Sequence, residues 1–581
     1  MERKDMMKLF GARAVHRVCV CFAYMIILAC FASPLFGSTG DVSLSVNGKA
    51  HKFYSFEELL PYSYPLINEH PLQVINPIDQ SDSYLFGITL DELFPILVDA
   101  WKLTVLINGR GSAIDNPLLA EELGNLAIVI GYQDKTGTVD LLDDTIVIDI
   151  AGEQSTNRIV EIWLSWEGVE QLKDEIQRFA DMHDITVKSL EVPKISSKLI
   201  QTQRGGGSLP DVVMVQSDYI DELVQANTIQ ALDYLKLDGF STAGIDSFNL
   251  YRRQWAIPFY FDSQAIICNG DVFSQIGLNA NDIRTLDDLE QTAAAIKTYA
   301  AAHSVPIVPM SWNLYSAYWL LPFQYGFGKT HLIESDGTVD VADKPTVEAM
   351  EYLISLLDRS LLSANERDAM LSNFITGKTA MMLSASYMIG ELERLGLSFF
   401  IVPFPVNQKT GAKIAPILDY KGFAITKRSK NPILARRLIQ YLTGIGVQQR
   451  FTTTVNKLPA LELAMQIDQF DSQIRKAVKL SAAGGQCLPP DPAYGIYKNV
   501  LWGMIRLIID RKFTVSDGLK EAQRLIDAQV QDVMDQLPDE YKSVYATHEG
   551  ETHDEKTDVE TVDNAADTDS GGFFKWLRNL W

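Results

Sequence analysis

The chain has 581 residues, of which 47% are hydrophobic, and a formal net charge of −23 at pH 7. This length is too great for one domain and predicts about three or four, while the hydrophobic share is ample for buried cores. The strong negative charge excludes a general nucleic-acid-binding surface.

Residues 1–37 predict an export signal, because the basic stretch "MERKDMMKLFGARAVHR" precedes the uncharged apolar run "VCVCFAYMIILACFA" and then small residues. The apolar run is shorter than the roughly 20 residues of a membrane span, which favours cleavage over a permanent anchor. The stretch "ILAC" at 27–30 resembles a lipoprotein signal that would make Cys30 the lipidated N-terminus, although Leu28 is unusual at its position. Cleavage near Gly37 is the alternative.

Residues 41–152 predict a small α+β accessory domain. The segment "DVSLSVNGKAHKFY" alternates like two strands around an Asn-Gly turn. The segments "SFEELL" and "TLDELFPILVDAW" carry the capping-box pattern of helix starts. The runs "KLTVLING", "LAIVIGY" and "DTIVIDIAG" predict strands, and no catalytic cluster is present in this part of the sequence.

Residues 157–537 alternate between strand and helix patterns. A strand at "IVEIWL" precedes a helix at "VEQLKDEIQRFADMH", and the same order repeats through "DVVMVQSDYIDELVQ". This alternation predicts a parallel sheet with right-handed crossovers, whose ligands bind at the carboxyl ends of the strands. The glycines of "RGGGSLPD" precede a strand rather than a helix, so we interpret them as a helix stop and not as a phosphate-binding loop.

The C-terminal part changes in composition. From Glu549 to Asp569 there are nine acidic residues and one lysine, so 546–570 predicts a solvated, disordered tail. The aromatic segment "GGFFKWLRNLW" at 571–581 is either a docked terminal turn or an amphipathic peptide for a membrane or partner. Beyond the export signal only Cys268 and Cys487 remain; two buried free thiols are favoured over one bridge.

Six segments resemble, in the family's order, the extracellular solute-binding proteins of ABC importers, which include maltodextrin-binding proteins. They are "IVEIWLSWEGVEQL", "GGGSLPDVVMVQSD", "WAIPFYFDSQAIICNGDVF", "TLDDLEQTAAAIK", "FITGKTAMMLSASYMIGEL" and "GFAITKRSKNPILARRLIQYL". The resemblance covers about 157–537 and implies an α/β, two-lobed periplasmic-binding-protein fold of type II, closing over its ligand by a hinge. By analogy, the first lobe is 157–261 with a return at about 420–475, and the second is 263–417 with the final helices.

The resemblance also implies a ligand site between the lobes. Sugar faces pack on aromatic rings, and sugar hydroxyls bind carboxylates and amides. Val215 stands where maltodextrin binders have a tryptophan and Ser316 replaces an acidic contact, which argues against maltose itself. For each aromatic residue, ordinary core packing is the alternative. The implied ligand-binding residues are Trp166, Glu167, Gln216, Asp218, Tyr219, Asp262, Tyr318, Trp319, Tyr387 and Tyr497, with Tyr494 near the last of them.

These features predict a binding protein that delivers a small solute, a carbohydrate above all, to permease subunits in the membrane. The sequence has no G-x-S-x-G, H-E-x-x-H or G-x-x-x-x-G-K-[ST] motif, so no enzyme, metal or cofactor is predicted. The predicted location is the periplasm or the outer face of a bacterial inner membrane, with attachment through lipid at Cys30. The alternative is a ligand-sensing or adhesive surface lipoprotein that uses the same cleft and the N-terminal domain.

Overall fold

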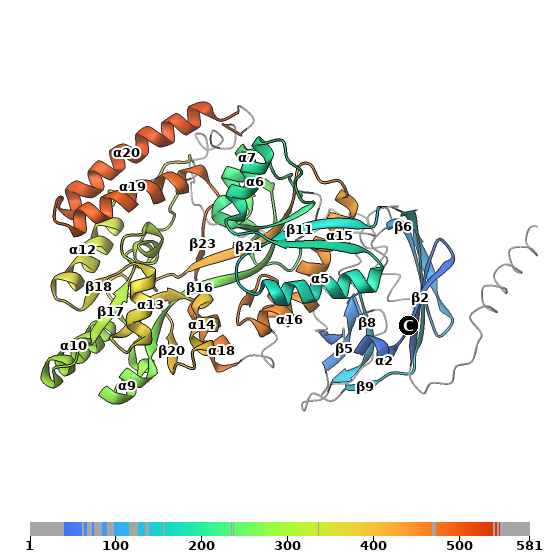
Figure 1. Cartoon of the computed structure of the whole chain (residues 1–581), viewed down its shortest axis with the longest axis horizontal. Coiled ribbons are helices and arrows are strands. Elements are labelled where there is room, and N and C mark those ends of the chain that lie inside the picture. Colours follow the sequence, from blue (N-terminus) through green and yellow to red (C-terminus); the bar gives the residue numbers. More distant parts are fainter. Residues whose placement is uncertain are drawn as a thin grey trace, which may run out of the picture.

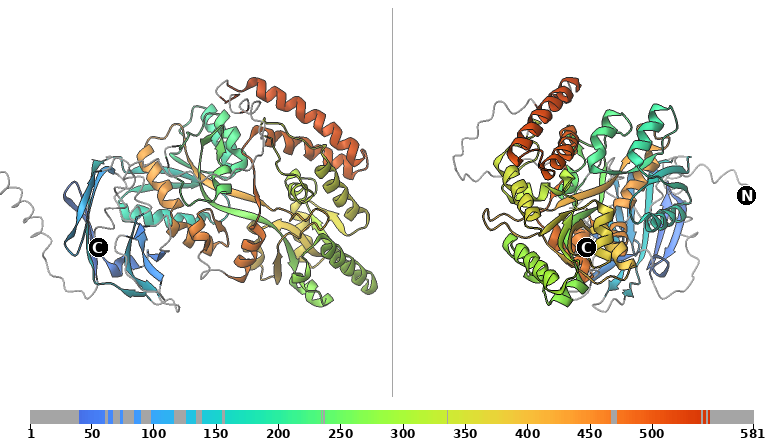
Figure 2. Two further views of the ribbon diagram at one scale, coloured as in Figure 1. Left: turned by 180° about the vertical axis from the view of Figure 1, so that it is seen from behind. Right: turned by 60° about the vertical axis from the view of Figure 1, so that its left-hand side comes forward.

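The computed structural model describes residues 40–60, 63–66, 73–74, 84–89, 98–115, 126–133, 139–154, 157–466 without 234, 236 and 335, 472–538, 541–542 and 545. These residues form an elongated body with a β-rich domain at one end and two α/β lobes beyond it (Figures 1 and 2). The predictions for 1–37, with Cys30, and for 546–581 lie outside the described residues. Within these ranges, none of the helices combines the length and apolar character that a membrane crossing requires.

The N-terminal domain contains two sheets, with strand orders β2-β1-β10-β6-β7 and β3-β5-β8-β4, and β9 pairs with β8. The predicted Asn-Gly turn joins β1 to β2, and Asn47 and Gly48 both have positive φ. The capping box of Ser55 and Glu58 starts helix α2 as predicted. The described elements are β1 (Asp41–Val46), β2 (Lys49–Ser55), α2 (Phe56–Leu59), β3 (Tyr64–Leu66), β4 (Gln73–Val74), β5 (Tyr84–Thr89), β6 (Val98–Ile107), β7 (Arg110–Asp115), β8 (Leu126–Gln133), β9 (Val139–Leu141) and β10 (Thr145–Gln154).

One helix prediction in this domain is wrong at its end. The helix pattern of "TLDELFPILVDAW" extends to Trp101, but Val98–Trp101 begins strand β6. Strand β6 pairs antiparallel with β10 on one side and with β7 on the other, and this tertiary pairing overrides a local helix preference. The domain lies beside helix α5 of the next domain (Figure 1), where Lys52 of β2 donates a hydrogen bond to the backbone carbonyl of Met182.

Lobe 1 begins with the predicted β-α-β-α order, and β12, β11 and β13 lie side by side in parallel. Ile162 and Leu164 of β11 face one buried cluster and Trp163 faces another, so both faces of the sheet are covered. Gly205 caps the end of α6 and Gly206 follows with φ 71°, which confirms the glycine helix stop. The elements are β11 (Ile159–Leu164), α5 (Val169–His183), β12 (Thr186–Glu191), α6 (Ile195–Arg204), β13 (Val212–Gln216), η3 (Ser217–Tyr219), α7 (Ile220–Gln225), α8 (Thr242–Asp246), β14 (Asn249–Leu250), β15 (Arg253–Gln254), α15 (Pro432–Thr443), α16 (Ile445–Thr454), β22 (Leu458–Pro459) and α17 (Glu462–Gln466).

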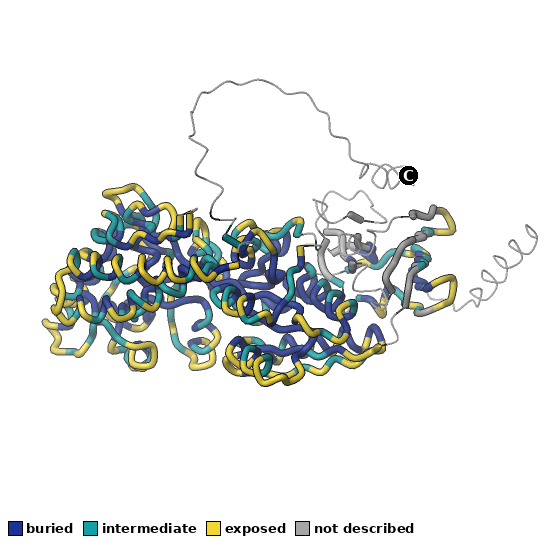
Figure 3. Tube along the Cα trace, turned by 90° about the horizontal axis from the view of Figure 1, so that it is seen from above, coloured by how far each residue is buried: buried dark blue, intermediate teal, exposed yellow. Residues whose placement is uncertain are grey.

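Two antiparallel strands, β16 (Ile257–Asn269) and β21 (Ile417–Ile425), cross between the lobes. The first half of β16 pairs with β21 in lobe 1, and its second half pairs with β19 and β20 in lobe 2. Every residue of both strands is buried, and Figure 3 draws buried residues of the two lobes in dark blue. Strand β16 therefore runs without a break from lobe 1 into lobe 2. It passes from one lobe to the other near residue 262, where the family resemblance places the boundary between them.

Lobe 2 continues the sheet in the order β16-β19-β17-β18, and α19 and α20 cover it from above in Figure 1. Its core extends from Ile266 of β16 to Val530 of α20. The lobe 2 and final elements are α9 (Gly270–Ile276), η4 (Ala280–Asp282), α10 (Leu286–His303), β17 (Val308–Trp312), η5 (Ala317–Trp319), α11 (Leu321–Gly326), α12 (Lys344–Asp358), β18 (Leu362–Ala364), α13 (Arg367–Ile375), β19 (Thr379–Ala385), η6 (Ser386–Met388), α14 (Ile389–Arg394), β20 (Phe399–Val402), α18 (Gln473–Ala482), β23 (Gln486–Cys487), α19 (Pro492–Ile509) and α20 (Val515–Gln536).

Candidate functional site

The candidate site lies where the two crossing strands meet short helical turns from both lobes. In lobe 1, η3 follows the carboxyl end of β13 directly. In lobe 2, η6 follows the end of β19 in the same way, and η5 follows β17 after a short loop. Because the carboxyl ends of strands are where α/β sheets bind ligands, these turns bring side chains of both lobes to one place.

A buried charge network forms the floor of this site. Asp262 of β16 is fully buried and accepts hydrogen bonds from Lys457 Nζ at 2.7 Å and Ser386 Oγ at 2.6 Å. Lys421 Nζ lies 3.3 Å from the other oxygen of Asp262 and 2.8 Å from Asp419. Lys457 and Ser386 belong to different lobes, so the Asp262 carboxylate ties the lobes together at the hinge.

The network keeps Asp262 and Lys421 in their charged forms. Burial alone would raise the pKa of Asp262, but Lys457 and Lys421 outweigh burial and the pKa is lowered. Burial alone would lower the pKa of Lys421, but Asp419 and Asp262 outweigh it and the pKa is raised. The Asp262 carboxylate and the Lys421 ammonium therefore stay charged inside the protein. The network reaches the surface through Glu167, whose half-exposed carboxylate lies 3.3 Å from Lys457 Nζ.

Next to Asp262 lie two carboxylates, Asp218 and Asp419, that each have one oxygen free to accept a further hydrogen bond. Asp218 of η3 lies 3.3 Å from Lys498 Nζ of α19, so this ion pair spans the two lobes. The second oxygen of Asp218 and the second oxygen of Asp419 are both buried and have no hydrogen-bond partner. Burial raises the pKa of Asp419 to about 6, although Lys421 counteracts this, and burial also raises the pKa of Asp218. Each free oxygen can accept a hydrogen bond from a ligand hydroxyl or ammonium.

Tyrosine rings surround these carboxylates. The Lys498 ammonium lies over the ring of Tyr219 at 5.6 Å and over the ring of Tyr494 at 5.4 Å, within the range of cation–π contacts. Tyr318 is half-buried against the lobe 2 core, and the burial of its hydroxyl raises its pKa well above the usual value, with smaller contributions from Asp419 and Tyr387. The Arg367 guanidinium lies over the ring of Tyr387 at 5.4 Å. Flat rings and carboxylates from both lobes therefore gather in one polar cluster between the lobes.

Most of the residues predicted from the sequence lie in or beside this interlobe cluster. Glu167, Asp218 and Asp262 take part in its ion pairs, and Tyr219 in its cation–π contacts. Tyr318 and Tyr387 lie close to Asp419, which influences the pKa of each. Asp262 itself is fully buried, and protein donors occupy both of its oxygens.

The remaining predicted residues lie at the margin or in the cores. Gln216 is half-buried and pairs with Lys421 in the sheet register, and Trp166 packs against both lobe 1 clusters with φ 69°. Trp319 is 7% exposed in the lobe 2 core, and Tyr497 is fully buried and donates a hydrogen bond to Gln324 Oε1 at 2.6 Å. For Trp319 and Tyr497, the structure therefore agrees with ordinary core packing, which was the alternative to ligand binding for each aromatic residue.

Sequence reasoning missed four charged residues of the site, namely Asp419, Lys421, Lys457 and Lys498. A signal exists for the first two, because Asp-x-Lys inside the apolar run "ILDYKGFAI" places both side chains on one face of a buried strand. No local signal marks Lys457 or Lys498, since their partners come from distant segments. Within the described ranges, no group of three or more His, Cys, Asp or Glu side chains could hold a metal ion, and Cys268 and Cys487 are both free thiols.

Comparisons with known proteins agree with this architecture. The sequence profile of a family described as bacterial extracellular solute-binding protein matches residues 175–478. The maltodextrin-binding protein MdxE of Bacillus subtilis is 20% identical over 383 residues, which cover 64% of this chain and 88% of the relative. The galactooligosaccharide-binding protein of the same organism is 21% identical over 317 residues, covering 52% of this chain and 72% of the relative.

Solved structures show the same fold. The GacH receptor of Streptomyces glaucescens, determined unliganded and with acarbose, superimposes with a TM-score of 0.58 at 18% identity. The match covers 65% of this chain and 100% of the receptor. The maltotriose-binding protein of Thermus thermophilus gives a TM-score of 0.55 at 19% identity and covers 64% of this chain and 100% of its own. At these identities the likeness establishes the two-lobed type II binding-protein fold.

Proposed function

Because this chain belongs to the bacterial extracellular solute-binding proteins, we propose that it binds a carbohydrate between its lobes and delivers it to the permease of an ABC importer. The observation that carries the proposal is the pair of buried, unpartnered carboxylate oxygens on Asp218 and Asp419, set among tyrosine rings. Such oxygens gain a hydrogen bond when a hydroxyl group enters, and ring faces pack against the apolar faces of a sugar.

Binding between lobes also explains how the protein signals that it is loaded. A ligand that contacts both lobes binds the closed state better than the open state and shifts the population by that difference. The permease then receives a closed, loaded protein rather than an open one. The crossing strands β16 and β21 supply the hinge for this movement.

The relatives narrow the ligand class. Their names and titles give maltodextrin, galactooligosaccharide, maltotriose and acarbose, all of which are oligosaccharides or their analogues. Val215 is fully buried in the lobe 1 core and Ser316 precedes η5 without a charge, so the contacts of a maltose site are incomplete. An oligosaccharide other than maltose is the proposed ligand. The alternative of a sensing or adhesive lipoprotein is not favoured, because the relatives are named for the sugars they bind.

Isothermal titration calorimetry tests the proposal. The probes are maltotriose, a galactooligosaccharide and cellotriose, with spermidine and a tripeptide as ligands of other classes. We expect binding of at least one oligosaccharide, accompanied by compaction in small-angle X-ray scattering. Binding of the polyamine or peptide alone, or no binding and no compaction with any probe, would contradict the proposal.

Export and membrane attachment form a separate part of the proposal. Residues 1–37 and Cys30 lie outside the described residues, so the support is the sequence pattern together with the extracellular family. Mass spectrometry of the mature N-terminus decides between the two predicted forms. A lipidated Cys30 supports membrane attachment, and an unmodified N-terminus near Gly37 supports release.

A further inference from the structure

Three carboxylates of the site lie in a row across neighbouring strands. Asp419 of β21 stands directly opposite Asp262 of β16 in the sheet register. On the other side of β21, Gln216 of β13 stands opposite Lys421, and Asp218 follows two residues later in η3. The same antiparallel direction brings Asp218 towards Asp419. Burial raises the pKa of Asp419 to about 6, Lys421 counteracts this, and the nearby charge of Asp218 raises it further.

The charges of Asp218 and Asp419 are only partly balanced by lysines. The Lys421 ammonium is shared, because it lies 2.8 Å from Asp419 and 3.3 Å from Asp262. Asp218 lies 3.3 Å from the Lys498 ammonium through one oxygen. The second oxygen of Asp218 and that of Asp419 are buried and have no hydrogen-bond partner among the described residues. Neighbouring buried carboxylates of this kind favour the approach of a further positive charge.

The lysines of the site show which chemical group fits these surroundings. Lys421 and Lys457 place their ammonium groups over the ring of Tyr260, at 5.9 and 5.7 Å. Lys498 lies over the ring of Tyr219 at 5.6 Å. Each of these three ammonium groups also lies 2.7–3.3 Å from a carboxylate oxygen. An ammonium held by a carboxylate and a tyrosine ring is therefore a repeated arrangement here.

Tyrosines of lobe 2 lie near Asp419 as well. Tyr318 belongs to η5 and Tyr387 to η6. Burial raises the pKa of both hydroxyls, and the charge of Asp419 adds to the rise in each. A ligand hydroxyl that reaches Asp419 makes a hydrogen bond but leaves the charge of the carboxylate unbalanced. An ammonium makes the same bond, balances the charge and gains the tyrosine rings.

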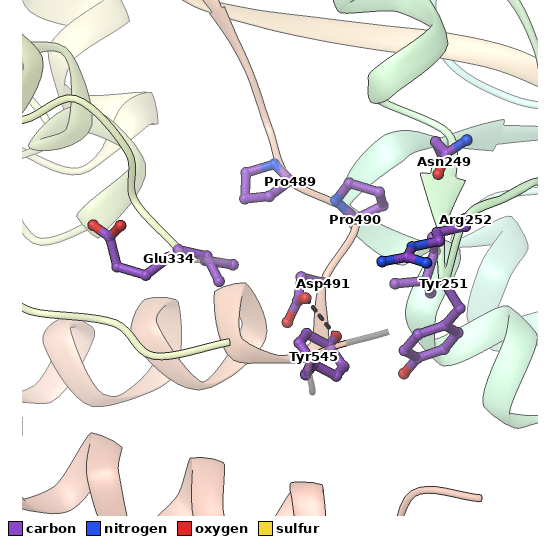
Figure 4. Close-up of a pocket in the computed structure, with 10 residues that line it drawn as sticks. Asn249, Tyr251, Arg252, Glu334, Pro489, Pro490, Asp491 and Tyr545 are labelled. Carbon is purple, nitrogen blue, oxygen red and sulfur yellow. Dashed lines mark hydrogen bonds between the residues drawn. The ribbon is translucent and has the colours of Figure 1, made fainter. Parts of the chain in front are cut away.

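A separate cavity of about 310 Å³ offers different chemistry (Figure 4). Asp491 lines this cavity and accepts hydrogen bonds at both oxygens, from the Tyr545 hydroxyl at 2.7 Å and from the backbone N–H of Ala493 at 2.8 Å. Arg252 adds a positive charge to the wall. The buried acceptors open to a ligand ammonium are therefore those of Asp218 and Asp419, not those of Asp491.

We propose that the ligand carries a protonated amino group, and that Asp218 and Asp419 bind this ammonium together. The inference rests on the proposed function and narrows its ligand to an oligosaccharide that contains amino sugars. An ammonium has several N–H donors, so one group can bond to both carboxylates. Charge-assisted hydrogen bonds are about twice as strong as neutral ones. An amino sugar should therefore bind about tenfold more tightly than its hydroxyl analogue.

Isothermal titration calorimetry with matched trisaccharides tests the proposal. Chitotriose and cellotriose share one backbone and differ at the second carbon of each ring, where chitotriose has an amino group and cellotriose a hydroxyl. At neutral pH we expect chitotriose to bind the wild type about tenfold more tightly than cellotriose. Triacetylchitotriose, in which acetylation removes the positive charges, should bind no more tightly than cellotriose.

Two site variants and one control locate the preference. Asp218→Asn and Asp419→Asn keep the size of the side chain and remove its charge, so each should lose the preference for chitotriose while the circular dichroism spectrum stays unchanged. Glu222→Gln removes an exposed carboxylate four residues after Asp218 and should keep the full preference. If Asp419→Asn does not fold, Asp218→Asn decides.

The outcomes separate this inference from the proposed function. Equal or tighter binding of cellotriose, triacetylchitotriose or another neutral oligosaccharide overturns the amino-sugar proposal and leaves carbohydrate binding intact. A preference for chitotriose that survives in the folded aspartate variants also overturns it. If none of the saccharides binds, both proposals are overturned.

Discussion

We call Asp262 with its protein donors the floor of the site, and Asp218 with Asp419 its wall; the floor and the wall use buried carboxylates in opposite ways. On the floor, both oxygens of Asp262 are held by protein donors, and two lysines balance its charge. On the wall, Asp218 and Asp419 each keep one buried oxygen without a partner. A buried polar group without a partner is costly. The floor, whose hydrogen bonds are all made, therefore stabilises the fold, whereas the wall gains hydrogen bonds when a ligand binds.

The largest effect should come from breaking the floor. Asp262→Ala leaves Lys421 and Lys457 buried without their shared partner, and we expect a loss of about 3–5 kcal/mol in the free energy of unfolding. Urea denaturation followed by circular dichroism measures this loss. Glu170→Ala is the control, because it removes an exposed ion pair with Lys173 at 2.7 Å and should leave stability nearly unchanged. A loss below about 1 kcal/mol for Asp262→Ala would show that the network is not a structural joint.

Changing the wall should affect ligand binding more than stability. Asp218→Asn keeps the size of the side chain and removes the charged acceptor, so affinity for the oligosaccharide should fall about 10- to 100-fold. Calorimetry measures the affinity, and the free energy of unfolding should change by less than about 1 kcal/mol. Glu222→Gln, on the exposed side of α7 in lobe 1, is the matched control and should bind as the wild type does. Equal affinity in Asp218→Asn and the wild type would remove Asp218 from the site.

The pH dependence of stability sharpens the contrast. The raised pKa of Asp419, about 6, means that the folded state holds a proton that the unfolded state releases at about pH 4. Asp419 therefore destabilises the fold as pH rises from about 4 to about 6. Asp262 has the opposite sign, because its lowered pKa adds stability that is lost as pH falls below about 4. Urea midpoints between pH 4 and 7 should fall with rising pH for the wild type relative to Asp419→Asn; parallel curves would contradict this assignment.

The smallest effect should come from Tyr497, a core tyrosine that the family resemblance had implied as a ligand-binding residue. Tyr497→Phe removes the hydrogen bond to Gln324, so the free energy of unfolding should fall by about 1 kcal/mol. Oligosaccharide affinity should stay unchanged, because the ring is fully buried in lobe 2. A clear loss of affinity in calorimetry would return Tyr497 to the ligand site.

Several parts of the fold could be predicted because their signals are local. The Asn47–Gly48 turn, the Ser55 cap and the glycine stop after α6 each depend on a few neighbouring residues. The helix predicted through Trp101 failed because β6 is held by β10 and β7, which the local pattern does not contain. In the site, Asp218 and Tyr219 could be located from the order of strands and loops because they follow the end of β13, and their contact with a ligand stays a prediction.

By itself, the sequence determined the α/β alternation, because it follows from periodicity. The two-lobed fold followed from the resemblance of six ordered segments to a known family. Only the tertiary structure decided which charges pair. Lys421 lies 159 positions from Asp262, and Lys498 lies 280 positions from Asp218. The crossing strands bring Asp419 directly opposite Asp262 in the sheet register. Contacts of this range leave no local pattern, since each depends on how separate segments pack, and that packing decides which carboxylates are satisfied and which can take a ligand.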